Sequence, residues 1–352
     1  MIRTFKGSTS VFVLWVGWVA WIWVLPGAIQ AQDSSDKTDL DRAIERGLQY
    51  LKRSQQADGS WNRDAAITSL SVMAILSAGY VPGEGPFAET LDRGIRWVLK
   101  IQQPNGVIAT NGSYEMYHHG IATLMLAEVV GMTQGPLADE VRSKLEKAVQ
   151  LILRAQRKSG HHKGGWRYRW NATDSDISVT GWQMLALRAA KNVGADVPAA
   201  AIADAVDYVK RCRDTSTGAF RYNPGGSRTV PCTGTSILAL EICGKQEHHS
   251  PEVLKAGSFL LRKENYPRWG HSYFYYSNYY CSQATFQLGG NYWSFYRPLL
   301  HKAILPNQKE DGRWEGGGSD SRFGPAYCTA MTILALSVEY RYLPIYQRDE
   351  QE

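Results

Sequence analysis

The chain has 352 residues, of which 44% are hydrophobic and 20% are charged, a balance that is typical of globular proteins and excludes a disordered or fibrous chain. Its formal net charge of +6 is too small to indicate the dense basic patch typical of nucleic-acid-binding proteins, so we predict no nucleic-acid partner. The five cysteines are an odd and low number, and a chain of this length can bury a large core without disulfides.

The first 31 residues have the pattern of a secretory signal. Arg3 and Lys6 precede an unbroken apolar run over residues 11–25, and Ile29-Gln30-Ala31 is an acceptable small-residue cleavage site. The run is shorter than the roughly twenty residues needed to cross a membrane. We therefore predict a signal peptide over residues 1–31 and export of the folded part to the periplasm or the exterior. An uncleaved N-terminal anchor, which would associate the protein with a membrane, is the alternative.

The rest of the chain repeats one pattern six times. In the first copy an amphipathic helix begins at Ala43, a loop with Gln, Gly and Trp follows, and a second helix rich in Ala and Leu ends at Gly79. Aligning the second helices gives one column with spacings of 47 to 60 residues: Ile67, His119, Val179, Cys232, Cys281 and Cys328. This regularity predicts a helical repeat protein over residues 41–347, between a flexible segment (32–40) and a polar tail (348–352).

The loops between the paired helices share a pattern of Gln, Gly and Trp. Residues 56–61 and 308–314 carry it in full as Gln-Ala-Asp-Gly-Ser-Trp and Gln-Lys-Glu-Asp-Gly-Arg-Trp, Gly164-Gly165-Trp166 follows a longer insertion after Gln156, and Gln103-Pro-Asn-Gly106 is degenerate. This pattern resembles the QW motif of the prenyltransferase and squalene-oxidase repeat proteins. The chain is thus similar to exported single-toroid members of the terpenoid cyclase and protein prenyltransferase superfamily. The resemblance implies an all-α fold, a closed α/α toroid of six helical hairpins with six inner helices, six outer helices and a central cavity.

In such a ring all six QW-type loops and all six inner-helix N-termini lie at one end, here called the mouth. Helix N-termini carry partial positive charge, and loop arginines such as Arg167, Arg221 and Arg228 would add to it. This favours a ligand with an anionic head group. Acidic residues such as Asp311 and Glu315 occur in the same loops, so ordinary solvated loop charge is the alternative.

Only part of the cyclase motif is present. Class II terpenoid cyclases donate a proton from the middle Asp of Asp-x-Asp-Asp, and Asp174-Ser-Asp176-Ile lies in the corresponding hairpin. A gapless alignment places the donor on Ser178, which cannot supply a strong acid, whereas a two-residue shift makes Asp176 the donor. Full cyclases also use two helical domains, and this chain has one.

Protein prenyltransferase activity is not supported by the residues that align with its zinc ligands. The family's Asp, Cys and His fall on Asp176, Ser178 and Pro231, and one ligand of three is too few for zinc. The thioester domains of complement-like proteins share the toroid but need a Cys-Gly-Glu-Gln element, which none of the five cysteines provides. We predict no cofactor.

Three polar positions on successive inner helices form the candidate catalytic site. Asp64, His118 or His119, and Asp176 would meet at the mouth, with Asp174 tuning the acid. They could form an acid–base site or a divalent metal site with two carboxylates and one imidazole. Helix capping is the alternative for the acids, because Thr229 and Asn278 occupy the same column, and a buried hydrogen-bonded residue is the alternative for the histidines.

Aromatic residues near these acids predict the wall of a ligand site, because aromatic faces stabilise cations and stack on sugars. The candidates, with three cysteines of the shared column, are Trp166, Arg167, Tyr168, Trp182, Tyr273, Tyr275, Tyr276, Cys232, Cys281 and Cys328. Core packing is the alternative for any one of them. The leading hypothesis is a polyprenyl or terpenoid ligand, with Asp176 initiating cyclisation or isomerisation if the protein is an enzyme. A non-catalytic scaffold and a carbohydrate-active toroid using Asp64 and Asp176 are the alternatives.

Overall fold

The computed structural model describes residues 38–347, and all regular elements in this range are helices. The predicted signal peptide, most of the 32–40 segment and the polar tail lie outside the described residues. None of the described helices is both long enough and apolar enough to span a membrane.

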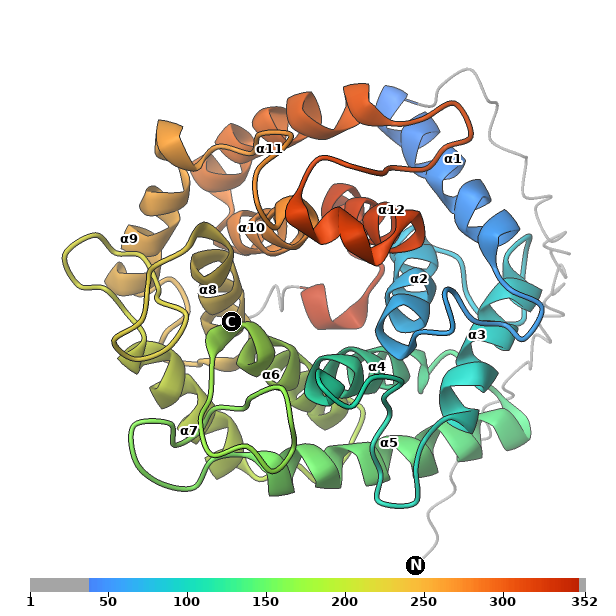
Figure 1. Cartoon of the computed structure of the whole chain (residues 1–352), viewed down its shortest axis with the longest axis horizontal. Helices are drawn as coiled ribbons and strands as arrows, with labels where there is room; N and C mark the ends of the chain where they lie inside the picture. The colour runs from blue at the N-terminus through green and yellow to red at the C-terminus, as the bar shows by residue number, and fades with distance from the viewer. Residues whose placement is uncertain (1–37, 348–352) are drawn as a thin grey trace, which may run out of the picture. The chain divides into compact units, whose positions relative to one another are not determined.

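The described residues form twelve α-helices in two concentric layers (Figure 1). The outer helices are α1 (Asp39–Ser54), α3 (Ala88–Lys100), α5 (Gly135–Ala155), α7 (Ala199–Arg211), α9 (Pro251–Leu260) and α11 (Gly290–Ile304). The inner helices are α2 (Ala65–Ser77), α4 (Glu115–Val129), α6 (Ile177–Asn192), α8 (Val230–Cys243), α10 (Phe274–Leu288) and α12 (Pro325–Leu336). The short 3-10 helices are η1 (Lys263–Asn265), η2 (Leu305–Asn307), η3 (Ser319–Phe323), η4 (Ser337–Tyr340) and η5 (Pro344–Tyr346). The predicted all-α toroid of six hairpins is confirmed.

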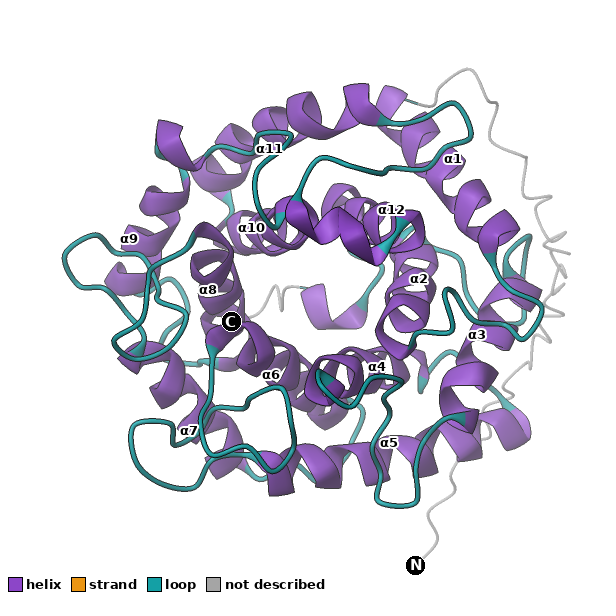
Figure 2. Cartoon of the chain, in the orientation of Figure 1, coloured by secondary structure: helices purple, strands orange, loops and turns teal. Residues whose placement is uncertain are grey.

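The ring of inner helices is closed. Each inner helix packs against its two neighbours around the ring, and α12 packs against α2 (Figure 2). Their sequences explain this arrangement, because nearly all residues of α2 and α12 are apolar or small and are buried. The outer helices bury only one face, as α1 does with Ile44, Leu48 and Leu51. An amphipathic helix followed by an apolar one therefore yields one outer and one inner helix in every repeat.

Four glutamines join consecutive hairpins with the same pair of hydrogen bonds. Each side-chain amide donates to a glycine carbonyl in its own loop and to a carbonyl of the next outer helix, at 2.8–3.2 Å: Gln55 to Gly59 and Thr90, Gln102 to Gly106 and Lys144, Gln156 to Gly164 and Ala201, and Gln308 to Gly312 and Ala43. Because Gln308 reaches α1, it links the last hairpin to the first. In two loops the bonding residue is Gln55 or Gln102, one position before the Gln56 and Gln103 matched in the sequence.

The glycines of these loops are fixed by backbone conformation and by close approach. Gly164 has φ +88°, and a Cβ there would lie 1.8 Å from the Asp204 carbonyl oxygen. Gly312 has φ +93°, and its Cβ would lie 2.2 Å from the Arg46 carbonyl oxygen. A side chain at either position would push the neighbouring hairpin away.

The loop tryptophans are structural. The fully buried Trp61, Trp166 and Trp314 each donate the indole N–H to a carbonyl near the end of the preceding outer helix. Trp166, which was predicted to contact a ligand, therefore lies in the packed interior of its loop.

The C-terminal segment returns into the ring (Figure 1). The Tyr346 hydroxyl is hydrogen-bonded to that of Tyr279 on α10, and the Gln287 amide donates to the Tyr346 carbonyl at 3.1 Å. The Ile345 N–H donates to the Glu128 carboxylate at 3.5 Å. Because Glu128 and Gln287 lie in the last turns of α4 and α10, the segment closes the ring at the end opposite the mouth.

Candidate functional site

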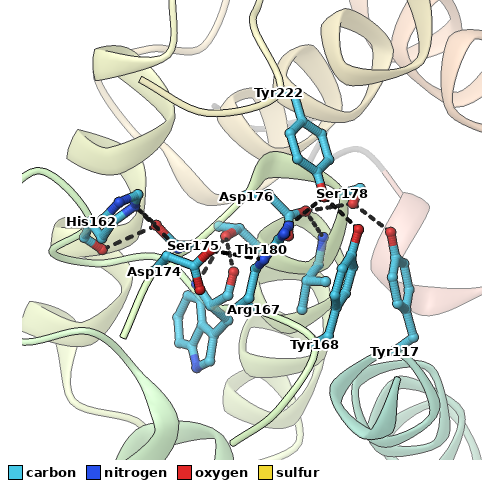
Figure 3. A network of polar contacts seen from close by, with 12 residues as sticks. Tyr117, His162, Arg167, Tyr168, Asp174, Ser175, Asp176, Ser178, Thr180 and Tyr222 are labelled. Atoms are coloured by element: carbon cyan, nitrogen blue, oxygen red, sulfur yellow. Dashed lines mark hydrogen bonds and ion pairs between the residues drawn. The ribbon is translucent and has the colours of Figure 1, made fainter. Parts of the chain in front are cut away.

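Asp176 is the centre of a polar network at the mouth (Figure 3). It is the N-cap of α6, where its carboxylate accepts the Val179 N–H at 3.0 Å. The carboxylate also accepts a hydrogen bond from the Ser178 hydroxyl and one from the Arg167 guanidinium at 2.6 Å. Asp176 is fully buried, so a ligand at the mouth would meet its neighbours rather than the carboxylate itself.

The charge state of Asp176 follows from these contacts. Burial raises the pKa of Asp176, while the donors Ser178, Arg167 and Val179 oppose that rise because they stabilise the carboxylate. Arg167 also contacts Asp174 at 3.1 Å and carries a permanent positive charge. Arg167 and the two other donors stabilise the ionised form of Asp176, and an ionised carboxylate holds no proton to donate. These contacts therefore argue against the proton donor that the sequence suggested and leave Asp176 as a group that can receive a proton.

Four partly exposed tyrosines, Tyr117, Tyr168, Tyr222 and Tyr276, direct their hydroxyls into this network and are here called the tyrosine cluster. Tyr117 donates to the Ser178 hydroxyl, and Tyr276 donates to the Ser178 carbonyl at 3.4 Å. The Tyr168 and Tyr222 hydroxyls lie 2.5 Å apart. These residues come from α4, from the loops before α6 and α8, and from α10, so the packing of four consecutive hairpins around the ring brings them together.

Arg167 links the tyrosine cluster to Asp176. Its guanidinium stacks on the Tyr168 ring, with 4.1 Å between Cζ and the ring centroid, and donates to the Tyr222 hydroxyl. Burial raises the pKa of both Tyr168 and Tyr222, so these phenols stay protonated near neutral pH. The accessible groups of the site are therefore neutral hydroxyls around one cation.

The hydrogen bonds of Tyr117 and Ser178 run in one direction. Tyr117 donates to Ser178, and Ser178 donates to Asp176. A proton taken up at the Tyr117 oxygen can therefore be passed inward, hydroxyl by hydroxyl, to the buried carboxylate. This chain of hydrogen bonds, here called the relay, runs from a tyrosine whose side chain is partly exposed to the buried carboxylate.

Asp64 and His118 form a separate pair. Asp64 caps α2 by accepting the Ile67 N–H at 2.9 Å, and its Oδ2 lies 3.7 Å from His118 Nε2. Burial lowers the pKa of His118, and the Asp64 charge opposes that change. Within residues 38–347 the structure gives no contact between this pair and Asp176. The predicted three-residue site is therefore divided into two groups.

His119 has a structural place in the second hairpin. Its Nδ1 accepts the Ile108 N–H at 3.1 Å and its Nε2 contacts the Ala148 carbonyl at 3.0 Å, while burial lowers its pKa to about 4. In four other hairpins a threonine hydroxyl accepts the corresponding loop N–H at 3.0 Å: Thr68, Thr180, Thr233 and Thr329. His118 is therefore the equivalent of Ile67 and Val179, and the sequence column that contained His119 was one residue out of register.

The capping hypothesis holds for three of its four residues. Asp64, Asp176 and Thr229 each cap an inner helix through the side chain. Asn278 instead lies inside α10, which begins at Phe274, and it accepts a hydrogen bond from the Tyr296 hydroxyl at 3.2 Å.

Aromatic side chains fill the ring beneath the tyrosine cluster. Trp182 is 1% exposed and stacks on Tyr279, with ring centroids 5.4 Å apart, and Tyr280 packs edge-on against it. Tyr275 is buried as well, whereas Tyr273 is 52% exposed just before α10. Of the predicted aromatic wall, Tyr168 and Tyr276 are the members that join the mouth network.

The predicted cysteine positions are packed in the core. Cys232, Cys281 and Cys328 are buried free thiols, as are Cys212 and Cys243. Burial raises the pKa of the first three to about 12, so they remain protonated and are poor ligands for a metal.

A polar hollow of about 430 Å³ lies in the loop that carries Tyr222, lined by Asp214, Arg221, Gly226, Ser227 and Arg228. Asp214 pairs with both arginines, at 3.1 Å and 3.5 Å. Two guanidiniums around one carboxylate leave a positive charge. At Arg313, by contrast, two acids, Asp311 and Glu315, surround one arginine, so no excess positive charge remains there.

No family model matches the chain, and no curated protein matches it. Its fold is similar to that of the type II terpene cyclase MstE from Scytonema in complex with geranylgeranyl dihydroxybenzoate (TM-score 0.57, 14% identity, 87% of this chain and 98% of that one). It is also similar to cellobiose 2-epimerase from Bacillus thermoamylovorans (0.60, 10%, 85% and 98%) and to unsaturated glucuronyl hydrolase from Bacillus sp. GL1 (0.60, 10%, 89% and 100%).

The toroid of this chain covers 98% of the MstE chain. At 10–14% identity these likenesses establish architecture alone. The chain is an α/α toroid, a fold that it shares with a terpene cyclase and with enzymes of carbohydrate metabolism.

Proposed function

We propose that the chain is an exported α/α-toroid enzyme that binds an acidic carbohydrate at the mouth and transfers a proton through the tyrosine cluster. The observation that carries the proposal is the relay from Tyr117 through Ser178 to Asp176, held beside Arg167. Enzyme chemistry is supported by the solved toroids above, whose names include a cyclase, an epimerase and a hydrolase.

A hydroxylated ligand suits the groups at the mouth. Phenol hydroxyls and a guanidinium offer several hydrogen bonds, and tyrosine faces stack on sugar rings. The neighbouring hollow adds Arg221 and Arg228 with an excess of positive charge, which favours a carboxylate or phosphate on the ligand. Beneath the cluster the side chains of Trp182 and Tyr280 are packed, which favours a compact ligand over a long chain.

The relay would act as a base. Tyr117 takes a proton from the ligand while giving its own to Ser178, and Ser178 gives its proton to Asp176. The ligand is left with an extra negative charge, which Arg167 is placed to stabilise, and the reverse transfers return the proton. This sequence of transfers is suited to epimerisation or isomerisation next to a carbonyl group.

A terpenoid ligand is the second candidate. The loops resemble the QW motif, and Asp176 stands at the inner-helix start where cyclases carry their acid. A polyprenyl chain would have to displace the C-terminal segment or the packed aromatics to enter the ring, because Tyr346 is hydrogen-bonded to Tyr279 of the inner helix α10 and Trp182 is buried. The paired-carboxylate glycosidase is less favoured, because Asp64 belongs to the His118 pair.

Proton transfer can be measured before the product is known. Candidate uronates, cellobiose as a neutral sugar and geranylgeranyl diphosphate are each incubated with the protein in D2O, and loss of C–H signals is followed by NMR. We expect exchange with a uronate, and a decrease of about 10²–10⁴-fold in Tyr117→Phe, which keeps the ring but removes the hydroxyl. Tyr342→Phe is the matched control, because Tyr342 is exposed and remote in sequence from the network.

The same titrations separate the alternatives. Binding of geranylgeranyl diphosphate without binding of any sugar would support the terpenoid hypothesis. Absence of binding and exchange with all three classes would support the scaffold hypothesis. Equal exchange rates in Tyr117→Phe and the wild type would contradict the relay.

A further inference from the structure

Three metal-ligating side chains meet at the C-terminal end of α8, away from the tyrosine cluster. Glu241 lies in the last turn of α8 and is buried, and His248 and His249 follow in the loop to α9. One ligand atom from each residue lies within 4.8 Å of the other two. Both histidine Nε2 atoms lie 3.7 Å from the same carboxylate oxygen, Glu241 Oε2.

The loop holds these groups in place without a ligand. The His249 N–H donates to Glu241 Oε1 at 2.9 Å, which leaves Oε2 directed at the imidazoles. The His248 N–H donates to the Gly244 carbonyl at 3.1 Å, and His249 has φ +50°, a conformation that histidine adopts more readily than most residues. The two imidazoles pack edge to face with centroids 4.1 Å apart. Backbone contacts therefore bring both rings to one carboxylate.

The distances suit a metal better than direct hydrogen bonds. A separation of 3.7 Å exceeds the 2.7–3.2 Å of a hydrogen bond between nitrogen and oxygen. Ligands 2.0–2.1 Å from a tetrahedral zinc ion lie about 3.4 Å from one another, so small side-chain rotations would complete the set. We propose that Glu241, His248 and His249 bind a divalent transition metal of the Zn²⁺ type.

The surroundings favour a cation at this position. The C-terminal end of α8 contributes partial negative charge, and the Glu241 carboxylate is buried. The nearby Glu247 is paired with Lys210 at 2.8 Å and so does not compete for the imidazoles. The two histidine side chains are 48% and 43% exposed, which lets an ion enter and leaves a coordination position for water.

The set of donors also limits which metal can bind. Two imidazoles with one carboxylate suit zinc, nickel or copper, whereas calcium and magnesium prefer sites built from oxygen alone. A bound ion would tie the end of α8 to the loop that leads to α9. The proposed metal would thus connect the fourth hairpin to the fifth. It shares no residue with the proposed proton relay, so either proposal can fail without the other.

The test uses the full chain without an affinity tag, titrated with ZnCl2 by calorimetry. We expect one saturable site, no binding of Ca²⁺ or Mg²⁺ there, and visible absorption bands of a nitrogen-ligated ion when Co²⁺ replaces zinc. His248→Ala and His249→Asn should each weaken zinc binding at least tenfold. Removing a residue that only hydrogen-bonds to a ligand already costs about tenfold or more in metal affinity, so removing a ligand should cost no less. Asn is chosen at His249 because it tolerates positive φ.

His271→Ala is the matched control, since His271 is an exposed histidine in another loop. Zinc should raise the melting temperature of the wild type and of this control, and should leave both ligand variants unchanged. Circular dichroism checks that each variant is folded; if His249→Asn is not, His248→Ala alone decides. Absence of a saturable site in the wild type, or equal zinc affinity in His248→Ala and the control, would overturn the proposal.

Discussion

Gln308 joins the last hairpin to the first, at the junction here called the seam. Removing the Gln308 side chain tests how the ring is closed. Its amide donates to the carbonyls of Ala43 and Gly312, each at 2.8 Å. Gln308→Ala removes both bonds at about 1 kcal/mol each, together with an exposed bond that the Gln308 side-chain oxygen accepts from Arg46, so we expect the free energy of unfolding to fall by at least about 2 kcal/mol. For a toroid of roughly 300 residues this corresponds to a melting temperature lower by about 3 °C, measurable by calorimetry.

Gln102→Ala is the matched variant, because Gln102 makes the same two bonds at an internal junction. The two variants should lose similar stability, but hydrogen exchange should rise in α1 for Gln308→Ala alone, since α1 is the helix that Gln308 anchors. An unchanged melting temperature in Gln308→Ala would refute the assignment of seam stability to these bonds. Increased exchange of α1 in both variants would show that closure does not depend on the seam residue.

Two further predictions concern buried positions. Burial raises the pKa of Glu128 to about 8 from an ordinary value of 4.5, so between these pH values the folded state binds a proton that the unfolded state has lost. The free energy of unfolding should therefore fall as pH rises from about 5 to 8. Urea unfolding of Glu128→Gln across that range should show no such fall, and the same pH dependence in the variant and the wild type would contradict the prediction. Gly164→Ala should lower the free energy of unfolding by about 3–5 kcal/mol, because its Cβ would meet the Asp204 carbonyl. Gly194→Ala, with the same φ of +88° and open space around it, should cost only about 1–2 kcal/mol in the same thermal melts.

The sequence was sufficient to predict the hairpins, because the alternation of amphipathic and wholly apolar helices is visible in the residue pattern. It could not fix register to the residue. Gln55 and Gln56 are adjacent residues of the same type, so the sequence does not show which of them makes the two hydrogen bonds. The position of the next outer helix decides that Gln55 does. His119 accepts the loop N–H that a threonine hydroxyl accepts in four other hairpins. The sequence alignment of the inner helices rested on their apolar residues, so it could not show that His119 corresponds to these threonines.

The candidate site was predicted only in part. Asp176, Arg167, Tyr168 and Tyr276 were identified, whereas Tyr117 and Tyr222 were missed. Both lie far along the chain from α6, and their convergence depends on how each helix or loop is rotated toward the ring centre. In the sequence, Ser178 was noted only because it stands where the cyclases have their acid. In the structure its hydroxyl accepts a hydrogen bond from Tyr117 and donates one to Asp176, so it connects the two residues.

The bond between Gln308 and Ala43 joins residues 265 positions apart. During synthesis α1 and α2 leave the ribosome long before α12, against which both pack in the finished protein. Until then the apolar surfaces of α1 and α2 that α12 covers have no final partner, and such exposed surface promotes aggregation. Contacts this distant also slow folding, because the loop must close before they form. Synthesis of the last forty residues of the folded part therefore completes the burial of the first forty, and the nearly finished chain is the stage at which aggregation is most expected.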